Sequence, residues 1–193
     1  MEGLIQFPAK FIYIHKVENH QEVKGKILPI IESDLFENKE KYFNDFGTWD
    51  CKVYTSFFDA DKGMDILKMV TEMQNAIWTA FDKMLENVQL NSYPKQSHIS
   101  LFWWNYYAKG HSQEVHQHCG ADFSGIYILK STDKNKTAFY SAENHRLLNK
   151  TILTDEVEEG NIILFPSHLP HYVNPIEDEE GRITIAFNIT CEV

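Results

Sequence analysis

The sequence predicts a mostly β fold with helical support, in which a β-sandwich or barrel packs against a long helix. Two observations carry this prediction: an amphipathic helical pattern lies in the first half of the chain, and short β-rich segments follow it. With 193 residues, 43% of them hydrophobic, the chain has enough apolar side chains for one sizeable core. We therefore expect a single domain over residues 1–193, in which residues 1–94 support a β core formed by residues 95–193.

The first half of the chain contains one strand-like and one helix-like pattern. Phe11, Tyr13 and His15 alternate with two isoleucines, which is typical of a strand. Between Met64 and Asn87, apolar residues recur at steps of three and four and so form one stripe of a long amphipathic helix. The residues of this stripe are Leu67, Val70, Met73, Ile77, Phe81 and Met84. We expect the stripe to face the core, because Met and aromatic side chains are usually buried.

After Pro94 the sequence becomes β-like. The segments rich in β-branched and aromatic residues are 98–107, 123–129, 137–140, 161–165 and 182–189. Clusters of Gly, Pro, Asn and Asp bound these segments, as turns between strands require. Several short strands at such spacing predict a sandwich or a barrel in this half of the chain.

Charge and composition argue against several classes of function. The net charge is −10, with acidic runs at Glu156–Glu159 and Glu177–Glu180, so a nucleic-acid partner is not expected. Three cysteines are too few for a disulfide framework, and no apolar run has the length of a membrane span. Residues Met1–Lys10 lack the pattern of a signal peptide, so we expect a cytoplasmic protein. The sequence leaves the oligomeric state open, with a homodimer as one option.

Three histidines in the β-rich half have the spacing of a metal site. His116 and His118 are separated by one residue, so on a strand both side chains point to the same face. His171 follows later in the chain, with His168 as the alternative third ligand, and the spacing to Arg182 favours His171. Imidazole suits iron, zinc, copper and nickel, so the ligand type alone does not name the metal.

Arg182 discriminates between the kinds of metal protein that this pattern allows. The chain has sixteen Lys and only two Arg, Arg146 and Arg182, and a guanidinium is suited to a bidentate pair with a carboxylate. Arg182 opens an apolar strand whose two isoleucines and Phe187 would take the opposite face. Thr184 shares the face of Arg182 and can add a hydroxyl donor. The alternative role for Arg182 is a surface salt bridge with the acidic run that precedes it.

Several segments of this half together resemble the 2-oxoglutarate and iron(II) dioxygenase superfamily, over roughly Ser97 to Ile189. They are Asn105–His118, Phe123–Tyr127, Gly160–Val173 and Arg182–Asn188. More narrowly, the chain looks like the small 2OG-Fe(II) oxygenases of marine bacteria and their phages. In prolyl-hydroxylase-like members a Tyr lies three residues before a Gly, and the first His ligand lies six residues after that Gly. Tyr107, Gly110 and His116 have this spacing, and the eleven residues from His171 to Arg182 match the family's late His and Arg.

The resemblance implies a double-stranded β-helix, related to jelly rolls and cupins, and an enzyme that uses iron(II), 2-oxoglutarate and dioxygen. The metal ligands it implies are His116, His118 and His171, and the co-substrate contacts are Arg182, Thr184 and Tyr107. The expected reaction is hydroxylation of a small molecule or protein side chain, with release of succinate and carbon dioxide. The alternative is a cupin-like three-His metal protein that does not use 2-oxoglutarate, either another dioxygenase or a non-catalytic binder.

Two positions depart from the superfamily's pattern. The usual first motif is His-x-Asp or His-x-Glu, whereas here the third position is His118, with Asp122 as an alternative source of a carboxylate. Relatives often carry a co-substrate-contacting Tyr on the following strand, where this chain has Tyr127 beside the aliphatic Ile128. A further group of side chains is expected near the substrate mouth: Trp103, Trp104, Asn105 and Asn188.

Overall fold

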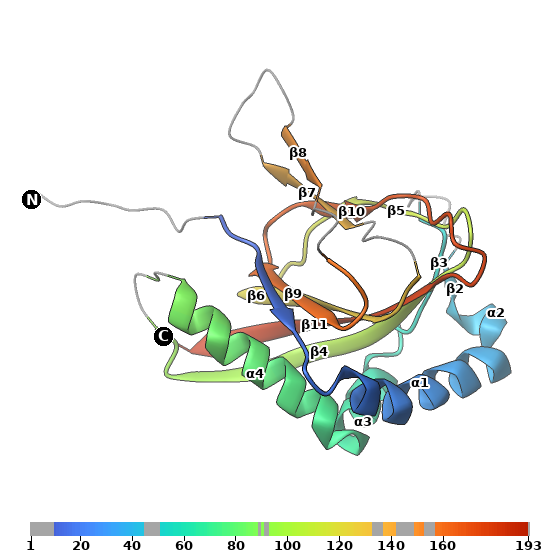
Figure 1. Ribbon diagram of the computed structural model, residues 1–193, viewed down its shortest axis with the longest axis horizontal. Helices are drawn as coiled ribbons and strands as arrows, with labels where there is room; N and C mark the ends of the chain where they lie inside the picture. The colour runs from blue at the N-terminus through green and yellow to red at the C-terminus, as the bar shows by residue number, and fades with distance from the viewer. Residues whose placement is uncertain are drawn as a thin grey trace, which may run out of the picture.

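Two antiparallel β-sheets lie face to face, and helices cover the outer face of the larger sheet (Figure 1). The computed structural model describes residues 10–44, 51–88, 90, 93–132, 137–141, 149–152 and 157–192. Arg146, Glu156 and residues 1–9 of the amino-terminal segment therefore lie outside the described residues. None of the described helices is both long and apolar enough to cross a membrane. The predicted β-sandwich with helical support is confirmed.

The larger sheet has the order β1-β9-β6-β11-β4-β3-β2, and the smaller sheet has the order β5-β10-β7-β8. The strands of the larger sheet are β1 (Tyr13–Lys16), β2 (Phe43–Asn44), β3 (Val53–Thr55), β4 (Gln96–Tyr107), β6 (Phe123–Lys130), β9 (Asn161–Pro166) and β11 (Arg182–Glu192). Those of the smaller sheet are β5 (Gln113–His116), β7 (Thr137–Ser141), β8 (Asn149–Ile152) and β10 (His171–Val173). The helices are α1 (His20–Glu37), α2 (Lys39–Tyr42), α3 (Ala60–Met69) and α4 (Thr71–Asn87).

Strand β11 lies at the centre of the larger sheet, between β4 and β6. Its side chains alternate between two buried environments, because the helices cover one face of the sheet and the smaller sheet covers the other. Ile183, Ile185 and Phe187 belong to the core beneath the helices, whereas Arg182 and Thr184 point into a cavity on the opposite face. The predicted division of this strand into two faces is confirmed.

The prediction of one continuous helix from Met64 to Asn87 is wrong, although every residue in that range except Val70 is helical. Helix α4 runs from Thr71 to Asn87, but residues before it belong to the separate helix α3. The two helices meet at Val70, whose backbone is not helical, with φ −119° and ψ 87°. Val70 is itself buried, so the apolar stripe continues across the break and hides it from a reading of periodicity alone.

Helix α1 was missing from the prediction. Its buried apolar side chains are Val23, Ile27 and Ile31, all at intervals of four residues. This signal is short, and the stretch from Glu32 to Lys41 at its end is strongly polar, while Pro29 inside the helix is typical of a boundary. The helix is held by packing on the larger sheet, which the local sequence does not show.

Candidate metal centre and co-substrate pocket

Three histidine rings meet between the two sheets. The side-chain nitrogens of His116, His118 and His171 lie within 4.8 Å of one another. His116 at the end of β5 and His171 at the start of β10 are opposite residues of an antiparallel pair, with ring centroids 4.2 Å apart. The geometry thus brings together the three predicted ligands from two neighbouring strands and the loop that follows β5.

The predicted placement of His118 on the same strand as His116 is wrong. Strand β5 ends at His116, and His118 lies in the following segment. The backbone N–H of His118 donates to the carbonyl oxygen of Ser167 at 2.9 Å, so a segment distant in sequence fixes its position. His118 therefore reaches the cluster through a tertiary contact, and strand alternation has no part in it.

Hydrogen bonds to one nitrogen orient each ring. The Nδ1–H of His116 donates to the Glu114 carbonyl at 2.9 Å, and that of His171 donates to the Leu169 carbonyl at 3.0 Å. The Nδ1–H of His118 donates to Asn188 Oδ1 at 2.8 Å. Because carbonyl oxygens only accept, each Nδ1 carries the proton, and each Nε2 keeps its lone pair for a metal.

A buried polar network supports His118. Ser124 Oγ donates to Asn188 Oδ1 at 2.9 Å and contacts Ser167 Oγ at 2.7 Å. It also lies 2.8 Å from His118 Nδ1. Both serines are fully buried, which is costly unless their hydroxyls are hydrogen-bonded, as they are here. The sequence analysis did not identify Ser124 and Ser167. A serine in or directly after a buried apolar strand could have indicated a hydrogen-bonded role for each.

The electrostatics of the cluster fit a metal site. Burial lowers the pKa of His116, and it lowers the pKa of His118 to about 4, with the neighbouring His116 adding to the effect. Burial also holds the pKa of His171 well below its usual value. All three imidazoles are therefore neutral near pH 7, the form in which histidine binds a metal. Three neutral nitrogen donors suit iron(II), as well as zinc or copper.

The alternative ligands lie elsewhere. His168 is exposed, and Asp122 is also exposed, with its Oδ2 accepting a hydrogen bond from the Cys191 backbone N–H at 2.8 Å. Among the described residues, neither belongs to a group of side chains close enough to share an ion. The carboxylate that the superfamily pattern would supply is thus absent from this cluster in the described part of the chain.

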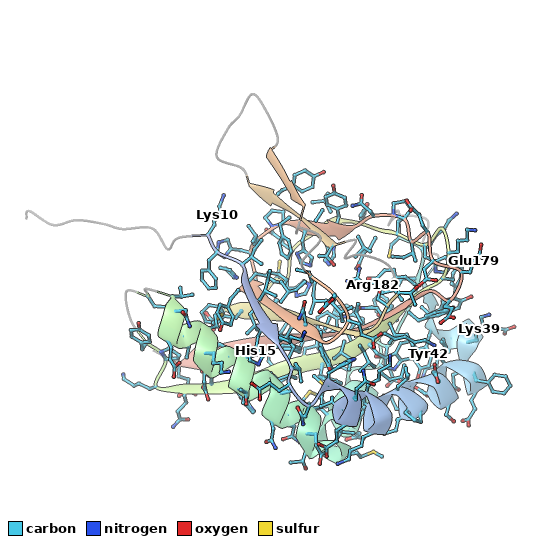
Figure 2. The ribbon with its side chains drawn as sticks, in the orientation of Figure 1. Lys10, His15, Lys39, Tyr42, Glu179 and Arg182 are labelled. Carbon is cyan, nitrogen blue, oxygen red and sulfur yellow. The ribbon has the colours of Figure 1, made fainter. Side chains whose placement is uncertain are left out.

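Arg182 lies between the two sheets, as Figure 2 shows, and only 1% of its surface is exposed. This burial contradicts the alternative role of Arg182 in a surface salt bridge. Its Nη2 donates to Thr137 Oγ1 on β7 at 3.1 Å. A buried guanidinium is a strong site for an anion, because a charge held away from water interacts more strongly with its partner.

Arg182 lines an inner chamber together with Thr184 and Tyr107, the other two predicted co-substrate contacts, and the three histidines. The Tyr107 hydroxyl donates to Gln113 Oε1 at 2.7 Å. Burial raises the pKa of Tyr107 and outweighs the opposing effect of the Arg182 charge, so the phenol is protonated near neutral pH. The inner chamber thus combines one cation with hydroxyl groups beside the histidine cluster.

A second, outer chamber of about 310 Å³ adjoins the first. Both chambers are lined by Trp103, Asn105, Gln113, His116 and His118. The histidine cluster therefore lies at the junction between a pocket that contains Arg182 and a second one that does not. A metal there would face both chambers.

The residues predicted near the substrate mouth divide into two groups. Trp103, Asn105 and Asn188 line the outer chamber. Trp104 points to the opposite face of the sheet, where it packs edge-to-face on Tyr42 with centroids 4.8 Å apart. Tyr127 lies on the same face as Trp104, so the sheet separates both residues from Trp103.

Tyr127 belongs to a polar cluster beneath the larger sheet. Its hydroxyl lies 2.5 Å from Nδ1 of His20 on α1, and Nε2 of His20 lies 3.0 Å from Glu159 Oε1. Lys24 on α1 forms a salt bridge with the same carboxylate at 2.5 Å. Tyr127 therefore ties α1 to the sheet and does not reach the inner chamber, which Ile126 lines from the same strand.

Comparison with known proteins connects this geometry to one superfamily. A family model described as "Putative 2OG-Fe(II) oxygenase" matches residues 101–188. No curated protein matches the chain. The predicted resemblance is confirmed at the level of the superfamily, because the matched region contains all three histidines and Arg182.

Solved structures share the fold over almost the whole chain. A prolyl-4-hydroxylase from Pseudomonas putida has a TM-score of 0.60 at 13% identity, and the alignment covers 95% of this chain and 94% of that one. A Trichoplax adhaerens prolyl hydroxylase, in complex with a hypoxia inducible factor peptide fragment, has a TM-score of 0.58 at 13% identity, covering 93% and 83%. The non-heme alpha ketoglutarate dependent epimerase SnoN from nogalamycin biosynthesis has a TM-score of 0.65 at 10% identity, covering 95% and 78%. The predicted jelly-roll fold class is thus confirmed.

Proposed function

We propose that this chain is an oxygenase of the 2-oxoglutarate and iron(II) dioxygenase superfamily, which hydroxylates its substrate at the expense of 2-oxoglutarate. One observation carries the proposal. One ring nitrogen from each of three histidines converges where the inner chamber of Arg182 meets the larger outer chamber. Such an arrangement lets a metal contact a co-substrate on one side and a substrate on the other.

The chain's own residues would act by binding and orienting. Arg182 would pair with the distal carboxylate of 2-oxoglutarate, because its buried guanidinium presents two parallel N–H donors. Thr184 would add a hydroxyl donor from the same chamber, and Tyr107 would turn to the co-substrate the hydroxyl that now donates to Gln113 Oε1. His116, His118 and His171 would hold iron(II), which supplies the activation of dioxygen when bound. The buried walls exclude water from the reacting groups.

The proposed reaction balances with dioxygen as the oxidant. One oxygen atom enters a C–H bond of the substrate to give C–OH, and the other joins the keto carbon of 2-oxoglutarate. The bond between that carbon and its carboxylate breaks, which releases carbon dioxide and leaves succinate. The C–H bond and the oxidative decarboxylation each supply two of the four electrons that reduce dioxygen.

A specific observation also favours a second candidate, the three-His metal protein that does not use 2-oxoglutarate. The cluster contains His118 where the superfamily's usual motif has a carboxylate. Three neutral imidazoles leave a bound divalent ion with its full positive charge, which changes its metal preference and reactivity. Arg182 in the inner chamber argues for the first candidate, since such a protein needs no anchor for an oxo-acid.

Anaerobic addition of iron(II) and 2-oxoglutarate to the purified protein tests the proposal. A weak visible charge-transfer band is expected from bidentate chelation of the metal, followed after admission of oxygen by succinate and carbon dioxide. A protein that retains only zinc, and that gives neither the band nor succinate, would be the second candidate.

A further inference from the structure

The described walls of the outer chamber contain no Lys, Arg, Asp or Glu. The residues that line it are Cys51, Val53, Thr55, Phe57, Phe58, Leu101, Trp103, Asn105, Gln113, His116, Gln117, His118, Cys119 and Asn188. In a chain with 24% charged residues and a net charge of −10, a chamber wall without charged residues favours uncharged ligands. Its side chains offer no ion pair to a charged ligand, and entry would impose the cost of desolvating one.

Aromatic rings form one side of this chamber. Phe57 packs edge-to-face on Trp103 and on Phe58, with centroids 5.2 Å apart in both pairs. Phe57 and Phe58 remain 36% and 61% exposed. Two adjacent, solvent-exposed phenyl rings at the edge of a pocket gain most from a ligand that covers them.

Asn105 supplies a polar group within the apolar chamber. The residue is only 6% exposed and lines both chambers, beside His116 and His118. Within the described part of the chain, its side-chain amide makes no hydrogen bond to another protein group. Its amide faces the chamber, so a ligand there can complete its hydrogen bonds, and an amide can both donate and accept.

We infer that the outer chamber takes a compact, uncharged molecule with a flat apolar body and one amide-like or hydroxyl group. The flat body lies against Phe57, Phe58 and Trp103, and the polar group meets the amide of Asn105 beside the histidine cluster. The volume of about 310 Å³ is at the low end of the range for small-molecule pockets, which limits the ligand to a compact molecule. That this molecule is the oxygenase substrate rests on the proposed function.

Three isosteric probes separate charge from shape: benzamide is neutral, benzoate is anionic and benzamidine is cationic. Each is titrated calorimetrically into protein already saturated, without oxygen, with iron(II) and 2-oxoglutarate, so that the inner chamber cannot take benzoate. Benzamide should bind at least tenfold more tightly than either charged probe. Equal affinities, or a preference for a charged probe, would overturn the inference.

Variants assign this selectivity to named residues. Asn105→Leu keeps the approximate volume and should weaken benzamide about tenfold while leaving toluene nearly unchanged. Leu101→Lys places a cation on the chamber wall and should reverse the preference towards benzoate.

Phe58→Ala should weaken the binding of benzamide, because it removes one of the exposed rings at the edge of the chamber. Phe36→Ala, which removes an 87% exposed phenyl from α1, is the matched control. Far-ultraviolet circular dichroism and thermal unfolding verify that each variant is folded. Unchanged selectivity in both Asn105→Leu and Leu101→Lys, if both fold, would contradict the inference.

The same samples distinguish failure of this inference from failure of the proposed function. The visible band and succinate formation report on iron and 2-oxoglutarate alone. Selective benzamide binding to metal-loaded protein without either signal would support the outer site and reject the oxygenase. Succinate formation without a preference for the neutral probe would support the oxygenase and reject the outer site.

Discussion

His116 and His171 face each other across the β5 and β10 ladder, with ring centroids 4.2 Å apart and each Nδ1–H bonded to a backbone carbonyl of its own segment. Two of the three candidate ligands are thereby fixed by backbone geometry, before any metal arrives. Such preorganisation means that a truncated ligand should cost metal binding, while the larger apolar core beneath the helices stays intact. The smaller core touches His171 through Phe139 and Phe165, with ring centroids 5.6 and 4.8 Å away, so thermal unfolding must verify the fold of a His171 variant.

His171→Ala should markedly lower the amount of iron(II) or zinc that the protein retains, because it removes one of three converging nitrogens. His168→Ala is the matched control, since His168 lies three residues earlier, in the turn that precedes β10, and is exposed. Metal content per chain by inductively coupled plasma mass spectrometry measures both. Metal loss in His168→Ala with a normal content in His171→Ala would show that the wrong histidine was assigned.

Asn188→Ala should weaken metal binding about 10- to 100-fold, the usual effect of losing the partner of a ligating histidine. The physical reason is that Asn188 Oδ1 accepts the hydrogen bond that sets the orientation of His118. Competition with a chromophoric chelator gives the dissociation constants. Asn87→Ala is the control, because Asn87 is exposed at the end of α4 and its amide donates to the Lys83 carbonyl, away from the histidines. An unchanged metal affinity in Asn188→Ala would mean that His118 is held by its backbone contact alone.

The cluster around Glu159 predicts a specific dependence of stability on pH. Burial raises the pKa of Glu159, but hydrogen bonds from Lys24 and His20 together outweigh it, so the net shift is downward from 4.5. A carboxylate whose pKa is lower in the folded state stabilises the protein above its unfolded pKa, and this contribution is lost as the pH falls through the folded pKa. The free energy of unfolding should therefore decrease as the pH falls below about 4.5.

Glu159→Gln removes this titration, so the acid side of its stability profile should be flatter than that of the wild type. Denaturant unfolding between pH 3 and 7 would measure the effect. Glu180→Gln, on an exposed acidic run, is the control. Parallel profiles for wild type and Glu159→Gln would show that the carboxylate is not stabilised in the folded state.

The parts of the structure that were predictable from the sequence are those where a local pattern repeats. Alternation in β11 correctly separated Arg182 and Thr184 from Ile183 and Ile185, because a period of two survives in any strand with two different faces. The position of His118 was not predictable in this way, since the carbonyl of Ser167, far along the chain, fixes it. Contacts between distant segments leave no trace in local periodicity.

The limits of local patterns also explain two features that the sequence did not predict: the break between α3 and α4, and the hydrogen bonds that support His118. The break between α3 and α4 was hidden because Val70 is buried and continues the apolar stripe. The link between Ser124 and Asn188 joins two strands that are neighbours only in the folded sheet. A sequence shows that a residue is polar within an apolar run, but the partner that satisfies it depends on topology.

Arg182→Ala tests most directly which of the two candidate functions is correct. If the guanidinium holds the distal carboxylate of 2-oxoglutarate, its removal should cost roughly 2–5 kcal/mol, the range for truncating one member of a buried charge pair. Affinity for 2-oxoglutarate should then fall by on the order of a hundredfold or more. Metal content should stay nearly constant, because Arg182 is not one of the clustered side chains.

Arg182→Lys should retain part of the affinity, since it keeps the charge and loses the two-pronged geometry of the guanidinium. Thr137→Val provides a matched comparison, because Thr137 Oγ1 accepts the hydrogen bond from Arg182 Nη2 and so orients the guanidinium without adding a charge. It should weaken 2-oxoglutarate less than Arg182→Ala does. Calorimetric titration of the metal-loaded proteins measures each constant. Indistinguishable affinities for wild type and Arg182→Ala would exclude Arg182 as the anchor and favour the three-His protein that does not use 2-oxoglutarate.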